Sequence, residues 1–239
     1  MGRPQLTVAA VPLRLEGTFL LLVACPTVLL WTHFLSFTPD VFEGDLVLSA
    51  LGGVLFAVML VLHEIGHALV LRSQGGRVRV LTLSLVPHVI ADGAPSDDRY
   101  MAYALGGVMV DALMLVLGLT LLGFGNATAN AALAGVAALI VLVKLAALVW
   151  NLWPIPWNDG SLALETWNRI RLGRGSEAEA LRRTARQGRG VSIPIAACVA
   201  SGLWVTGLDP VQRIIFPVAA LGAGVWVVRR WASVGREES

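Results

Sequence analysis

The hydrophobic positions of the chain fall into six long segments that are separated by shorter polar stretches. A helix of about 20 consecutive apolar residues is long enough to cross a lipid bilayer, and each segment is of roughly this length. The segments cover residues 18–37, 46–71, 100–122, 131–153, 191–207 and 211–228. This pattern predicts an all-α polytopic membrane protein with about six transmembrane helices.

Two stretches depart from this helical pattern. Residues 77–86 alternate loosely, are rich in Val and Thr, and are followed by Pro87, which predicts a small β-hairpin or sheet at the membrane surface after the second helix. Residues 158–190 are expected to form a cytoplasmic loop, and a helix in it that ends near Gln187 is polar all round and therefore predicted to be solvated. The sequence contains no visible repeat or second soluble domain. We therefore expect residues 1–239 to form a single membrane domain, with the last two apolar segments as its final transmembrane helices.

The composition agrees with a membrane protein. Of the 239 residues, 56% are hydrophobic and only 14% are charged, and the mean hydropathy is +0.73. A soluble domain carries about 25% charged residues. The net charge is +2, and we expect the lipid bilayer, and no nucleic acid, as a partner. The two cysteines, Cys25 and Cys198, lie in apolar segments and form no Cys-x-x-Cys motif, so any metal site has to use histidines and carboxylates.

The basic residues predict the orientation in the membrane. If the N-terminus is cytoplasmic and the chain crosses the membrane six times, the segments that face the cytoplasm contain 16 of the 18 basic residues. These segments are residues 1–17, 72–99, 158–190 and the C-terminal tail. By the positive-inside rule, we expect a multi-pass protein of the cell membrane with both termini in the cytoplasm.

The second apolar segment carries the motif His63-Glu64-Ile65-Gly66-His67 near its cytoplasmic end. On a helix, residues four apart lie on one face about a turn apart, so the two histidines can bind one metal ion. The glutamate lies beside them, where a carboxylate can take a proton from a metal-bound water. Such side chains are costly inside a bilayer, so the motif indicates a functional site.

A catalytic zinc site needs a third protein ligand, and this ligand has to lie at the same depth as the motif. Asp159 meets this requirement within residues 151–160, which read NLWPIPWNDG. The prolines end the preceding helix, and an Asp-Gly turn can direct the carboxylate back toward the metal. An ordinary surface turn is the alternative for this segment. Glu165 is a competing ligand, but it falls among helix-forming residues further from the membrane.

Together, the two motifs resemble those of the site-2 protease family of intramembrane zinc proteases. The resemblance covers a catalytic core of about residues 46–165. It implies a core of three helices and one Zn²⁺ per chain, held by His63, His67 and Asp159. It also implies that Glu64 is the catalytic base. The absence of a PDZ-like insertion makes the chain similar to the minimal prokaryotic branch.

The resemblance further implies a substrate. It would be a single-span membrane protein already trimmed by a site-1-type protease, such as an anti-sigma factor or a remnant signal peptide, and Asn151 would lie close to it. The bond to be cut has to be unwound from its helix, and residues 75–90 are expected to hold it extended by strand addition. His88 in this stretch is either a gate or transition-state donor or an ordinary loop histidine.

The third apolar segment departs from the family pattern. The family usually carries Gly-Pro-x-x-Asn there, whereas this chain has Gly107-Val-Met-Val-Asp111. Asp111 lies about 11 residues from the cytoplasmic end of its span, and Lys144 about 9 residues from the same end of the next. An unpaired charge at this depth costs about 3 kcal/mol, so we expect the two side chains to pair across antiparallel helices. The alternative is a Lys144 that snorkels or lines a water path.

Two other classes of protein share parts of this pattern. A membrane zinc protease of the prenyl-protein type would use a glutamate as its third ligand, which brings Glu165 into consideration. A non-catalytic zinc-binding membrane protein or transporter would keep the metal ligands but would not need Glu64.

Overall fold

The computed structural model describes residues 7–8, 11–32, 39–84, 87–92, 97–156, 158–173, 175–205 and 212–237. The helical fold with a small sheet after the second helix is confirmed. The elements are β1 (Thr7–Val8), β2 (Val11–Leu15), α1 (Phe19–Trp31), η1 (Asp40–Phe42), α2 (Leu46–Ser73), β3 (Arg77–Leu83), β4 (His88–Asp92), α3 (Asp97–Ala127), α4 (Ala131–Leu152), α5 (Asp159–Leu172), α6 (Glu177–Val205) and α7 (Gln212–Glu237).

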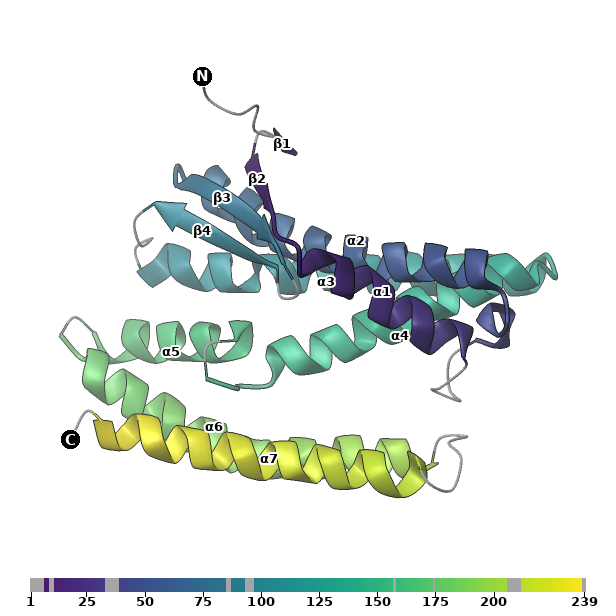
Figure 1. Ribbon diagram of the computed structural model, residues 1–239. Coiled ribbons are helices and arrows are strands. Elements are labelled where there is room, and N and C mark those ends of the chain that lie inside the picture. Colours follow the sequence, from purple (N-terminus) through teal and green to yellow (C-terminus); the bar gives the residue numbers. More distant parts are fainter. Residues whose placement is uncertain are drawn as a thin grey trace. The chain divides into compact units, whose positions relative to one another are not determined.

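The chain divides into two compact units. The first comprises Met1–Pro95 and Leu105–Leu148, and the second comprises Ser96–Ala104 and Val149–Ser239. The long helices α3 and α4 each begin in one unit and end in the other. Figure 1 gives the place of each element along the chain.

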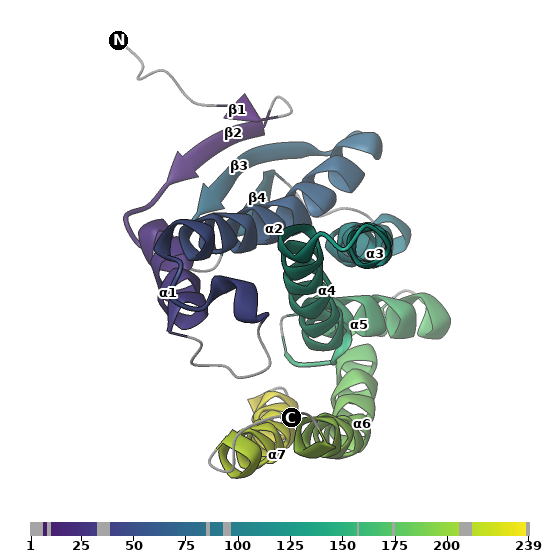
Figure 2. The same cartoon turned by 90° about the vertical axis from the view of Figure 1, so that its right-hand side faces the viewer.

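The sheet of the first unit lies along α2. Its strand order is β1-β2-β3-β4, with β2 parallel to β3 and β3 antiparallel to β4. Val11 of β2, Leu81 of β3 and Ala68 of α2 form a buried cluster between the sheet and the helix. Figure 2 shows the strands alongside α2. The strand predicted at residues 77–86 is therefore present as β3.

The sequence does not predict the strands that precede the first helix. β2 has only five residues and includes Pro12, so it is too short to show the alternation of a strand. Its partner is distant in the chain, because Leu13 pairs with Leu81. Pairing over such a separation leaves no local sequence signal.

Glycines of α2 allow α1 to pack closely against it. A Cβ atom on Gly53 would lie 2.2 Å from the Thr27 Oγ1 atom, and one on Gly52 would lie 2.6 Å from the Leu30 side chain. Small residues favour this kind of close packing between helices in membranes. α1 has 13 residues, whereas a span over residues 18–37 was expected; residues 33–38 lie outside the described part of the chain.

Four of the described helices are long and apolar enough to cross a membrane. They are α2, residues Arg99–Ala127 of α3, α4, and residues Ile214–Ser233 of α7. The length and apolar composition of these helices, together with the fold, indicate a membrane protein. The candidate spans among the described residues are thus fewer than the six apolar segments predicted.

The expectation of a separate, fully solvated helix that ends near residue 187 is wrong. This helix continues into the apolar segment predicted at residues 191–207, and the two form one helix, α6, which is described to Val205. Its N-terminal half is not exposed all round, because Ala180 and Thr184 are buried. Thr184 Oγ1 accepts a hydrogen bond of 2.9 Å from Asn168 Nδ2 of α5. The buried face consists of small and hydroxyl side chains, which carry little hydrophobic signal.

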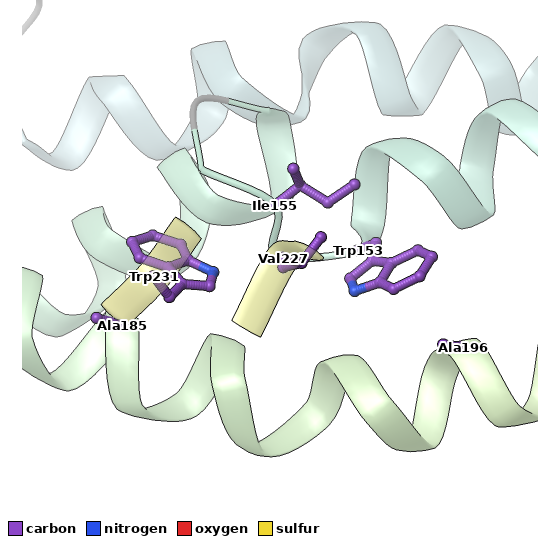
Figure 3. Packing of buried hydrophobic residues seen from close by; sticks show 6 residues of the cluster. All are labelled: Trp153, Ile155, Ala185, Ala196, Val227 and Trp231. Carbon is purple, nitrogen blue, oxygen red and sulfur yellow. The ribbon is translucent and has the colours of Figure 1, made fainter. Parts of the chain in front are cut away.

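In the second unit, two tryptophans fix the segment that links α4 to α5. Trp153 Nε1 donates to Ser192 Oγ of α6 at 3.1 Å, and Trp231 Nε1 of α7 donates to the Pro154 carbonyl oxygen at 2.7 Å. Figure 3 shows the buried cluster around them, which contains Trp153, Ile155, Ala185, Ala196, Val227 and Trp231. The proline-containing segment is therefore held on both α6 and α7.

Candidate metal centre

The two histidines of the motif converge on one face of α2. His63 and His67 are both buried, and their Nε2 atoms lie 3.2 Å apart. Their rings meet edge to face with centroids 4.9 Å apart. The four-residue spacing on a regular helix thus brings two imidazole nitrogens to a single point, as the sequence predicts.

This separation fits a shared metal ion. Two nitrogen ligands at 2.0–2.1 Å from a tetrahedral zinc stand about 3.3 Å apart, which is close to the 3.2 Å between the two Nε2 atoms. His63, His67 and Asp159 each offer one ligand atom of a kind that zinc accepts. The chemistry of these donors and the separation of the imidazole nitrogens therefore fit a zinc site.

A pair of glycines on α3 leaves room next to the two imidazoles. A Cβ atom on Gly107 would lie 2.5 Å from His63 Nε2 and 2.5 Å from His67 Nε2. Its neighbour Gly106 lies against the backbone of Gly66, because a Cβ atom there would stand 2.8 Å from the Gly66 carbonyl oxygen. α2 and α3 therefore cross at backbone contact, and the missing side chain of Gly107 leaves the space beside the Nε2 atoms open.

Asp111 and Lys144 form an ion pair next to this site, as the sequence predicts. Lys144 Nζ of α4 donates to Asp111 Oδ1 at 2.6 Å and to the Met59 carbonyl oxygen of α2 at 2.7 Å. Both side chains are 0% exposed. The other carboxylate oxygen, Asp111 Oδ2, lies 2.8 Å from His63 Nδ1. Sequence reasoning misses this last contact, although Asp111 follows Gly107 by one helical turn, which places both on one face of α3.

Glu64 follows His63 on α2 and is half-buried. Its position in the chain fixes it beside the first histidine, as the motif requires. Its role as the catalytic base stays a prediction.

In the second unit, a tight turn sets the position of Asp159 at the start of α5. The Asn158 side chain caps this helix by accepting from the Ser161 backbone N–H at 3.0 Å. Its amide also donates to the carbonyl oxygens of Trp150, at 2.8 Å, and of Trp153. Gly160 lies directly on the end of α4, since a Cβ atom there would stand 2.5 Å from the Leu152 carbonyl oxygen. Sequence reasoning passes over Asn158, although an Asn before a helix is a recognisable cap.

The remaining candidates are placed as follows. Glu165 lies on α5 and forms an ion pair with Arg169, one turn along the same helix. Asn151 is partly buried in the last turn of α4, and His88 is exposed at the start of β4, opposite Thr82. Of the predicted site residues, the first unit brings together His63, His67, Asp111 and Lys144. Asp159, Asn151 and Glu165 belong to the second unit, and their roles and that of His88 stay predictions.

Comparison with known proteins identifies the type of fold. No family model matches the sequence, and no curated protein matches it either. Among solved structures, the chain is similar to the site-2 protease from Methanocaldococcus jannaschii, with a TM-score of 0.51 and 15% sequence identity. The similarity covers 96% of this chain and 93% of that one. The chain therefore has the fold of a site-2 protease, in agreement with the resemblance of its two motifs.

Proposed function

We propose that this protein is an intramembrane zinc metalloprotease that hydrolyses a peptide bond within or near the transmembrane segment of a membrane protein. One observation supports this function above all others. In a fold of the site-2 protease type, an apolar helix brings two buried imidazole nitrogens within 3.2 Å of each other, and a glutamate directly follows the first histidine in the sequence.

The proposal assigns one Zn²⁺ per chain to His63, His67 and Asp159. Two imidazoles and one carboxylate would hold the metal with three protein ligands, the number found in catalytic zinc sites. Asp159 is favoured over Glu165 as the third ligand, because Asp159 belongs to the second motif that resembles the site-2 protease family and, unlike Glu165, is one of the residues that could hold a metal ion together with the two histidines. A glutamate as the third ligand would instead favour a protease of the prenyl-protein type.

Each residue of the site then has a defined task. Zinc held by these residues would polarise a carbonyl oxygen and lower the pKa of a water molecule to about 7. Glu64 takes the proton as water attacks the peptide carbonyl, and it returns this proton to the nitrogen of the leaving amine. The surrounding apolar helices restrict bulk water around the charges that develop, which strengthens the electrostatic interactions.

The substrate we propose is a single-span membrane protein already shortened by an upstream protease, such as an anti-sigma factor or a remnant signal peptide. β4 stands at the end of the strand order, so an extended segment of substrate can add to it through backbone hydrogen bonds. Asn151 and His88 are proposed to contact this segment. We place both termini, and the site itself, toward the cytoplasmic side of the cell membrane.

Metal removal provides the direct test of this function. We expect the purified protein, reconstituted in lipid vesicles with a single-span substrate, to cut that substrate within or next to its span. A zinc chelator should reduce the rate at least 100-fold, and added zinc should restore it; the products are mapped by mass spectrometry. Cleavage that continues in the zinc-depleted protein would contradict the proposal, as would a zinc-loaded protein that cuts no single-span substrate.

A further inference from the structure

Three residues of the first unit, each on a different helix, form a buried chain of polar groups that ends at His63. The chain runs from Lys144 on α4 through Asp111 on α3 to His63 on α2, with contacts of 2.6 Å and 2.8 Å. Lys144 and Asp111 are 0% exposed, and the His63 side chain is 10% exposed. All three lie in helices that are long and apolar enough to cross a membrane.

The donors and acceptors in this chain have one consistent arrangement. Lys144 can only donate, and it does so to Asp111 Oδ1 and to the Met59 carbonyl oxygen. A carboxylate can only accept, so Asp111 Oδ2 accepts from the N–H group at Nδ1 of His63. Neutral imidazole carries one proton, so the lone pair is then at Nε2, the atom that faces His67.

Lys144 also acts on the helix that carries His63. The Met59 carbonyl lies one turn before His63, at the position whose oxygen accepts from the His63 backbone N–H in an α-helix. The ammonium group therefore holds this turn of α2 and the Asp111 carboxylate at the same time. An apolar residue in place of Lys144 could pack there, but it would leave Asp111 as a buried charge without its cation.

We propose that Asp111 and Lys144 are positioning residues for the metal. Asp111 fixes the tautomer and the ring orientation of His63, so that Nε2 is presented to zinc. Lys144 supplies the charge that keeps this carboxylate stable in the membrane and fixes its direction. The inference rests on the proposed zinc site. In this chain, Asp111 and its ion pair with Lys144 support His63, whereas the family motif Gly-Pro-x-x-Asn has an Asn in place of Asp111.

Two double variants separate this role from simple packing. Asp111→Leu with Lys144→Leu removes both charges and also the acceptor for Nδ1 of His63. Asp111→Asn with Lys144→Leu removes the same two charges but keeps a carbonyl oxygen at position 111. Neither variant has a lone buried charge. In the absence of metal, their unfolding temperatures are therefore expected to lie within a few degrees of each other.

Zinc affinity, measured by competition with a chelator, is the decisive readout. Loss of a hydrogen-bond partner behind a ligating histidine typically weakens metal binding 10–100-fold. We expect this loss in the double-Leu variant, and an affinity within about threefold of the wild type in the Asn-Leu variant. Equal zinc affinities in the two variants would overturn the inference. A wild type that binds no zinc would instead overturn the proposed function.

A measurement on the unaltered protein covers the case in which the double-Leu variant does not fold. Nitrogen NMR of protein labelled at histidine, without metal, reports which ring nitrogen of His63 carries the proton; the signal is assigned by its loss in His63→Ala. We expect protonated Nδ1 and unprotonated Nε2. The reverse tautomer would refute the positioning role of Asp111.

Discussion

Gly107→Ala is expected to abolish zinc binding and, with it, proteolysis. The added methyl group would lie 2.5 Å from the Nε2 atoms of both His63 and His67, where a shared ion has to be. It cannot move away easily, because it belongs to a helix backbone that already contacts α2 at Gly66 and Gly106. We expect zinc affinity to fall at least 100-fold, measured by metal analysis and chelator competition.

The matched control for this variant lies on the same helix. A Cβ atom on Gly123 of α3 would meet nothing within 4 Å, so Gly123→Ala should leave both zinc content and cleavage as they are in the wild type. Both substitutions raise the helix propensity of α3 by the same amount. Zinc binding that survives in the Gly107 variant would mean that the two Nε2 atoms do not share an ion.

Glu64→Gln is expected to stop catalysis while the protein keeps its zinc. The amide has nearly the same shape as the carboxylate but cannot accept the proton of the attacking water. General acid–base catalysis typically contributes 10²–10⁴-fold, so we expect the cleavage rate to fall by about that factor. The rate is measured in lipid vesicles on the single-span substrate, with zinc quantified in the same preparation.

An exposed glutamate of the first unit serves as the control for this change. Glu43, which follows η1, is exposed, and Glu43→Gln should cleave at the wild-type rate. Undiminished cleavage by the Glu64 variant would rule out the proposed base. Zinc lost together with activity would instead assign Glu64 a role in metal binding.

The part of the site that follows from local sequence could be predicted well. Four-residue spacing on a helix fixes the convergence of His63 and His67, so the motif alone determines this half of the site. The depths of Asp111 and Lys144 in neighbouring spans also predict their ion pair, because a lone charge in a bilayer is costly. The contact of Asp111 with His63 depends on how α3 crosses α2. That crossing is set by the contact of Gly66 with Gly106, which no periodicity reveals.

The fold shows the same division between local and distant signals. The strand at residues 77–86 has the Val and Thr content and the terminal proline of an isolated strand, and it is present as β3. β2 was missed because its stability comes from pairing with β3, far away in the chain. The continuous helix α6 was missed because small buried residues such as Ala180 and Thr184 look like a solvated surface in the sequence.

The zinc content of purified Asp159→Ala, compared with that of Glu165→Ala, tests most directly how the metal is held. We expect one zinc per chain in the wild type and in the Glu165 variant. In the wild type, Glu165 forms an ion pair with Arg169 on the same helix. The Asp159 variant should lose most of its zinc under the same chelator challenge. Full zinc retention in the Asp159 variant, with loss in the Glu165 variant, would contradict a centre made of two imidazoles and the Asp159 carboxylate.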